Sequence, residues 1–121
     1  MTKHIKTGKS PIPQDKNDCT IRALSIAMEI EYMTAYGMIL GGAGRKMKRG
    51  VWIEPFYDSL FPNQITKPHM IVETFIKYIA HSGNWIISYK GHAFAVINGA
   101  IHDTYPEGCL NHHVVKAWRV K

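Results

Sequence analysis

Residues 91–105 read GHAFAVINGAIHDTY, and this stretch decides how the chain folds. Asn98 and Gly99 lie between two runs of alternating apolar residues, the strongest short-range signal for a β-hairpin with a two-residue type I′ turn. Such a turn sets the register, so the numbers of paired residues sum to 197. The expected pairs are Ile97 with Ala100, Val96 with Ile101, Phe94 with Asp103, and His92 with Tyr105.

One face of this hairpin carries a polar pair. Side chains alternate between the two faces of a strand, so His92 and Asp103 point to the same side as Phe94 and Val96. The two polar residues are diagonal neighbours, about 7–8 Å apart at the backbone, and long side chains can close that gap with a hydrogen bond. A carboxylate on an apolar face needs such a partner, because burying it alone is costly. His102 falls on the opposite face.

The stretch KNDCTIRALSIA, residues 16–27, places Cys19 at the start of an expected helix. Apolar residues recur at helical spacing from Cys19 to Glu31, which predicts a mostly buried helix over that range. Asn17 or Asp18 can cap it. Free N–H groups and the positive end of the helix dipole lower the pKa of a thiol in the first turn.

Cys19 is therefore either a packing residue or a nucleophile, and the second role needs partners. The usual partners are a histidine base and a polar group that orients its ring, and His92 and Asp103 supply both. Attack on a carbonyl also needs hydrogen-bond donors for the oxyanion. The backbone N–H of Cys19 is one donor, and the side-chain amide of Asn17 or of Gln14 is the other. Both amides remain candidates.

The rest of the chain predicts an α+β fold in which the Cys19 helix packs on an antiparallel sheet of about four strands. Further helices are expected at residues 34–40, 54–60 and 69–80. Strands are expected at residues 84–90, 92–98, 100–105 and 113–121. Residues 1–13 are expected to be an extended lead-in. The glycines of GGAG at 41–44 are expected to end the first of these helices, and the loop 41–50 is a candidate substrate lid.

Length, charge and hydropathy limit the classes of function. The 121 residues predict a single domain over 1–121, and the formal net charge of +6 favours an acidic partner. No apolar run approaches the ~20 residues that span a bilayer, and no secretory signal opens the chain, so we expect a cytoplasmic protein without membrane contact. The basic run RKMKR at 45–49 has no accompanying aromatic ladder or helix-turn-helix pattern, which indicates a solvated loop rather than a nucleic-acid contact.

The two cysteines do not predict a metal site. In a reducing compartment we expect Cys19 and Cys109 to be free thiols. Cys109, His112 and His113 form a Cys-x-x-His-His pattern, which is close to a zinc-ligand spacing. A structural zinc usually takes four ligands from two recognisable pairs, and the second pair is missing. We therefore expect no metal and no cofactor.

NDCTIRAL at 17–24, followed by GHAFAVINGAIHDTY at 91–105, resembles the papain-like cysteine peptidase superfamily. The similarity is to small peptidase-like proteins of bacteriophages and bacteria and, more distantly, to bacteriocin-processing peptidases. This resemblance implies a papain-like fold, with Cys19 as nucleophile, His92 as general base and acid, and Asp103 as the residue that orients His92. A phage origin would place the protein in the host cytoplasm. DCTIRAL is also similar to the opening block of ovarian-tumour-type deubiquitinases, which we interpret as shared superfamily architecture.

The approach to the cysteine departs from the family pattern. In papain and the bacteriocin-processing enzymes, the oxyanion glutamine stands six positions before the cysteine. Here that position is Pro13, and Gln14 is one residue closer to Cys19. The predicted function is a cysteine hydrolase that cleaves peptide or isopeptide bonds of a protein or peptide substrate. The alternative is a non-catalytic peptidase-fold protein that binds a host or viral protein; the sequence names neither the substrate nor an oligomeric state.

Overall fold

The computed structural model describes residues 3–6, 19–43, 54–89, 92–103 and 110–121, and within them the chain is mixed α+β. The helices are α1 (Cys19–Met28), α2 (Tyr32–Ala43), α3 (Glu54–Leu60) and α4 (Val72–Tyr78). The strands are β1 (Lys3–Lys6), β2 (Gln64–Thr66), β3 (Asn84–Tyr89), β4 (His92–Ile97), β5 (Ala100–Asp103) and β6 (Lys116–Arg119).

The described strands form one sheet in the order β1-β5-β4-β3-β6-β2. Neighbouring strands are antiparallel except β1 and β5, which are parallel. The four expected strands are present as β3 to β6. The expected number is wrong, because β2 and β1 each add a strand at an edge, and β1 lies within the stretch 1–13 expected to be a lead-in. Strands of three and four residues are too short to show a clear period in the sequence.

The Asn98-Gly99 turn has the conformation that the sequence predicts. The φ angles of Asn98 and Gly99 are 48° and 83°, as a type I′ turn requires. Val96 lies opposite Ile101, so the predicted register of β4 and β5 is confirmed. The side-chain oxygen of Asn98 also accepts a hydrogen bond from the N–H of Gly83 at 3.0 Å, which ties the turn to the start of β3.

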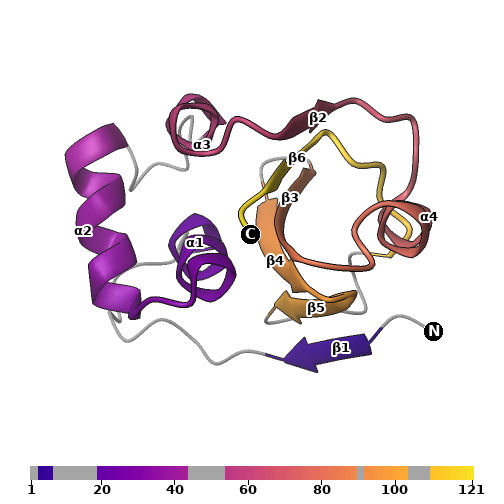
Figure 1. The fold of residues 1–121 in the computed structure, drawn as a ribbon, viewed down its shortest axis with the longest axis horizontal. Helices are drawn as coiled ribbons and strands as arrows, with labels where there is room; N and C mark the ends of the chain where they lie inside the picture. Colours follow the sequence, from indigo (N-terminus) through magenta and orange to yellow (C-terminus); the bar gives the residue numbers. More distant parts are fainter. Residues whose placement is uncertain (1–2, 7–18, 44–53, 90–91, 104–109) are drawn as a thin grey trace.

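Helices cover both faces of the sheet. Figure 1 shows α1, α2 and α3 on one side of the sheet and α4 on the other. The core between α1 and the sheet contains Ile21, Ala23, Leu24, Ala27, Ile86, Ala93, Ala95 and Trp118. The core between α4 and the sheet contains Val72, Phe75, Ile76, Ile87, Phe94, Val96 and Ile101. Because both faces are buried, β3 and β4 are almost continuously apolar.

Helix α1 ends three residues before the predicted end at Glu31. Glu29 has a left-handed φ of 59°, and the N–H groups of Glu29 and Ile30 donate to the carbonyls of Ile26 and Ser25 at 3.2 and 3.0 Å. This pair of bonds is a Schellman motif, which closes a helix by satisfying its last carbonyls. Glycine is the usual residue at this left-handed position. Because the residue here is Glu29, the sequence contains no signal for the end of the helix.

The predicted bounds are confirmed for α3 and wrong for α2. Helix α3 has the predicted bounds 54–60. Helix α2 begins before the predicted cap Thr34 and continues through Gly41 and Gly42, so the prediction that GGAG ends it at Leu40 is wrong. Intrinsic propensity is a weak preference that tertiary context overrides. Residues 44–53, which contain the basic run and most of the candidate lid, lie outside the described residues.

Helix α4 is shorter than the predicted range 69–80. His69 has a left-handed φ of 59°, and Ile71 pairs with His113 in an isolated antiparallel bridge. The residues before Val72 are therefore not helical. The helical spacing of apolar residues extends over them in the sequence, but the bridge between Ile71 and His113 holds them outside the helix.

Candidate functional site

Cys19 is the first residue of α1, as the sequence predicts. The side chain of Cys19 lies outside the part of the chain whose side chains are described, and so do the candidate oxyanion residues Gln14 and Asn17. The backbone nonetheless places Cys19 in the first turn, where N–H groups have no helical acceptor. This is the position in which a helix lowers the pKa of a thiol.

The direction of α1 over the sheet follows from one buried contact together with its packing along β4. The side-chain amide of Asn84 donates to the carbonyl oxygen of Ala27 at 2.8 Å. Asn84 also pairs with Ile97, the last residue of β4, so the end of α1 lies at the end of β4. The 10 residues of α1 span about 15 Å. Helix α1 also packs along β4 more extensively than along any other strand. Helix α1 and strand β4 therefore run in the same general direction, and Cys19 and His92 both lie toward the end of the sheet where these elements begin.

Small residues allow α1 to lie close to β4. Ala23 and Ala27 of α1 share a core cluster with Ala93 and Ala95 of β4, and all four side chains are at most 3% exposed. A helix whose contact face is alanine can approach a strand more closely than one with branched or aromatic side chains in between. The alternation of small and large residues in HAFAVI thus has a structural role: its alanines face α1.

The first turn of α1 is also held from α3. The hydroxyl of Tyr57 donates to the carbonyl oxygen of Thr20 at 2.6 Å. The Tyr57 side chain is fully buried, and its ring lies edge-on to that of Trp118, with 4.9 Å between centroids. The residue that follows Cys19 is thereby connected to the centre of the α1-side core.

His92 is the first residue of β4, but its ring packs away from the α1 face. His92 pairs with Tyr89, and their ring centroids are 5.4 Å apart at an interplanar angle of 67°. The His92 and Phe94 rings are 6.3 Å apart and inclined by 25°. Phe94 belongs to the core on the α4 side. The His92 ring therefore lies on the side of the sheet opposite α1, near the beginning of β4.

Asp103 is the last residue of β5, and its partner on the other side is Lys6 of the parallel strand β1. The pairing of β4 with β5 ends at Ala95 with His102, and the same register extended by one residue would set Asp103 opposite Phe94 and diagonal to His92. The side chain of Asp103 lies outside the described side chains. The placement of Asp103 beside His92 thus stays a prediction.

His102 occupies the opposite face, as predicted, and that face is the one that α1 covers. It pairs with Ala95, whose side chain is fully buried on the α1 side. Burial disfavours the charged imidazolium and lowers the pKa of His102. His102 is half-buried. The neutral form of His102 is therefore favoured at this half-buried position beside α1.

The histidines of the Cys-x-x-His-His pattern have separate surroundings. The His112 ring stacks on Tyr89, with 4.4 Å between centroids and 16° between planes. His113 is exposed and bridges to Ile71. Cys109 lies outside the described residues, and among the described ones no group of three or more histidine, cysteine, aspartate or glutamate residues can hold a metal ion.

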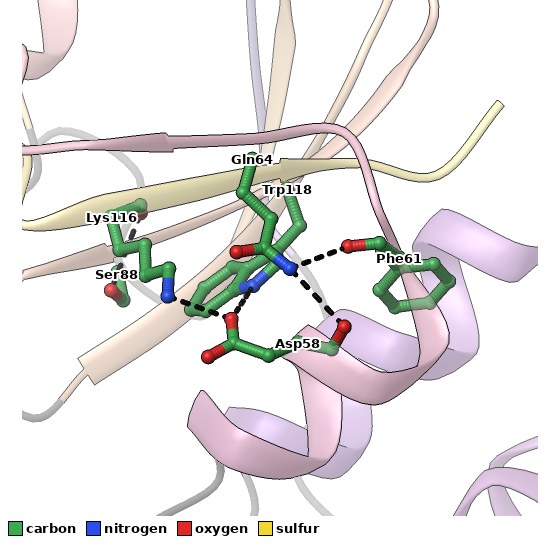
Figure 2. A network of polar contacts seen from close by, with 6 residues as sticks. All are labelled: Asp58, Phe61, Gln64, Ser88, Lys116 and Trp118. Atoms are coloured by element: carbon green, nitrogen blue, oxygen red, sulfur yellow. Dashed lines mark hydrogen bonds and ion pairs between the residues drawn. The ribbon is translucent and has the colours of Figure 1, made fainter.

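A polar network between α3 and the sheet was not predicted from the sequence. One carboxylate oxygen of Asp58 accepts hydrogen bonds from Trp118 Nε1 at 2.8 Å and Lys116 Nζ at 2.7 Å (Figure 2). Burial raises the pKa of Asp58, but the bonds from Lys116 and Trp118 outweigh it, so the pKa lies below the ordinary value. Asp58 and Trp118 are 60 residues apart, and no local pattern marks such a pair.

Comparisons of the chain with models of protein families, with curated proteins and with solved structures found no match. Among the described residues, none of the helices is long and apolar enough to span a membrane. The candidate site therefore rests on the order of Cys19, His92 and Asp103 along the chain and on the backbone geometry given above.

Proposed function

We propose that this protein is a cysteine hydrolase that cleaves peptide or isopeptide bonds in a protein or peptide substrate. One observation carries the proposal: the helix that begins at Cys19 and the strand that begins at His92 run in the same direction and begin at the same end of the sheet. Asp103 is the last residue of the neighbouring strand β5, and the register extended by one residue would set it diagonal to His92. The papain-like resemblance of the two sequence stretches supports the same assignment.

The chemistry is an acyl transfer to sulfur followed by hydrolysis. The Cys19 thiolate attacks the substrate carbonyl, and a carbon–sulfur bond forms while His92 gives its proton to the departing amine. His92 then takes a proton from water, the hydroxide attacks the acyl-enzyme, and the carbon–sulfur bond breaks to release the acid. Asp103 orients the His92 ring. The Cys19 N–H and the amide of Gln14 or Asn17 stabilise the oxyanion.

The test uses the full chain and fluorogenic peptide and isopeptide amides. We expect hydrolysis by the wild-type protein and a loss of at least about 10³-fold in kcat on Cys19→Ala, because the nucleophile is removed. Cys109→Ser is the matched control and retains activity. Hydrolysis that survives Cys19→Ala in a folded protein contradicts the proposal.

A second candidate, a non-catalytic binding protein with this fold, is favoured by the packing of the His92 ring against Tyr89 and Phe94. The two candidates differ in the reactivity of the Cys19 thiol. In a Cys109→Ser background, fast alkylation by iodoacetamide well below the ~8.5 pKa of a free thiol supports the hydrolase. Alkylation that follows an ordinary thiol profile supports the binding protein.

A further inference from the structure

Helix α3 connects the nucleophile turn of α1 to the sheet. Its Tyr57 hydroxyl donates to the Thr20 carbonyl oxygen at 2.6 Å, and Tyr57 is fully buried. The Tyr57 ring also packs edge-on against Trp118 of β6, with an interplanar angle of 68°. A side chain clamped at both its ring and its hydroxyl has almost no freedom to rotate.

Helix α3 itself is fixed to the sheet by the residue that follows Tyr57. Figure 2 shows the Asp58 carboxylate directed at Lys116 and Trp118, which both donate to it. The side chain of Lys116 is only 13% exposed. A neutral residue at 58 would leave this ammonium with a weaker partner, so the charge of Asp58 matters for the position of α3.

The end of α3 is held as well. The side-chain amide nitrogen of Gln64 donates to the carbonyl oxygens of Asp58 and Phe61 at 3.1 and 2.9 Å. Figure 2 shows these bonds on the far side of the helix turn from Lys116. Because bonds at two points connect α3 to β6 and to β2, the Tyr57 hydroxyl has a defined position relative to the sheet.

We propose that Tyr57 is a positioning residue for the Cys19 thiol. In an α-helix a carbonyl in the first turn already accepts one bond from the N–H four residues later. The Tyr57 hydroxyl is a second donor to the Thr20 carbonyl, and it holds the peptide unit between Thr20 and Ile21, one residue after Cys19. It thereby fixes the first turn of α1, in which Cys19 lies. This inference rests on the proposed function and names the residue that holds the helix turn of its nucleophile in place.

The experiment compares Tyr57→Phe with the wild-type chain, both in a Cys109→Ser background, by the pH dependence of iodoacetamide alkylation. Tyr57→Phe keeps the ring in the core and removes only the donor. We expect alkylation at pH 6.5 to slow by about three- to tenfold, the factor that one hydrogen bond represents. The midpoint of the profile moves toward the ~8.5 of a free thiol. With a peptide substrate, kcat falls while KM changes little.

Two further variants complete the experiment. Tyr78→Phe is the matched control, since Tyr78 is 64% exposed and its ring contacts Lys77; its profile stays that of wild type. Asp58→Asn loosens α3 without touching the core ring of Tyr57, and we expect a shift in the same direction. If circular dichroism shows that Tyr57→Phe does not fold, the alkylation profile of Asp58→Asn tests the inference in its place.

The outcomes separate this inference from the proposed function. Suppose that wild-type Cys19 is alkylated well below the pH expected for a free thiol. If folded Tyr57→Phe then gives the same pH profile, the inference is overturned and the proposed function stands. If Tyr57→Phe does not fold, the same profile in Asp58→Asn has that meaning. A wild-type Cys19 that alkylates as an ordinary thiol contradicts the proposed function and the inference with it.

Discussion

Asn84, the first residue of β3, donates its side-chain amide N–H to the carbonyl oxygen of Ala27, near the end of α1, at 2.8 Å. The bond is buried, and Asn84 is only 7% exposed. It joins the start of β3 to the end of the helix that begins at Cys19.

Asn84→Ala removes this donor and leaves a buried carbonyl without its side-chain partner. We expect the free energy of unfolding to fall by about 2 kcal/mol, the usual cost of an unsatisfied buried polar group. Urea denaturation measures the change. Asn63→Ala, at an exposed position, is the matched control and changes stability by less than about 0.5 kcal/mol. An Asn84→Ala effect as small as that of the control contradicts the role assigned to the bond.

His92→Gln tests the base of the proposed triad. Without an imidazolium to stabilise the thiolate, the pKa of Cys19 rises toward ~8.5. The pH profile of iodoacetamide alkylation in a Cys109→Ser background records that rise. His113→Gln removes an exposed histidine and is the control. If both variants alkylate like wild type, His92 is not the partner of Cys19.

Asp58 gives stability a dependence on acidic pH. Its pKa in the folded protein is below the ordinary 3.8, so the unfolded chain takes up a proton first as the pH falls. The stabilisation is complete above the unfolded value and is lost as the pH falls through the folded one. We expect the difference in unfolding free energy between wild type and Asp58→Asn to be constant from pH 7 to about 5 and to shrink below about 4. Glu73→Gln, at an exposed position, shows no such change.

His102 acts in a higher range of pH. Burial lowers its pKa in the folded protein below the ordinary 6.5, so between the two values the unfolded chain binds more protons. The stability that it contributes is therefore present above about 6.5 and falls as the pH drops through the folded pKa. Thermal melts between pH 5 and 8 measure the slope. We expect His102→Gln to flatten it and His81→Gln, at an exposed position, to leave it unchanged.

Glu29→Gly relieves the strain at the end of α1. Glu29 has a φ of 59°, which costs a side-chain-bearing residue about 1 kcal/mol and costs glycine little. The substitution also removes an exposed ion pair with Lys121 at 2.8 Å, worth at most about 1 kcal/mol. We expect a net gain in unfolding free energy of about 0.5 kcal/mol by urea denaturation. Glu29→Ala, which keeps the strain and loses the pair, should be less stable than wild type, and equal stability of the two variants contradicts this account.

Features that depend on neighbouring residues could be predicted from the amino-acid sequence. The Asn98-Gly99 pair favours positive φ at both positions, and a two-residue turn leaves only one register, so the pairing of Val96 with Ile101 followed. The spacing of apolar residues predicted α1 and its start at Cys19. The placement of Asp103 diagonal to His92 stays a prediction, which extends the same register by one residue.

The face of the sheet that each helix covers, and the contacts that hold the helices there, depend on long-range packing and could not be predicted from the sequence. Both faces of β4 are apolar, so alternation alone could not show that Ala93 and Ala95 lie under α1 while Phe94 lies under α4. The bond from Tyr57 to Thr20 joins residues 37 positions apart, and the parallel pairing of β1 with β5 spans most of the chain. Local conformation is encoded in adjacent residues, whereas contacts of this kind form only when the whole chain packs.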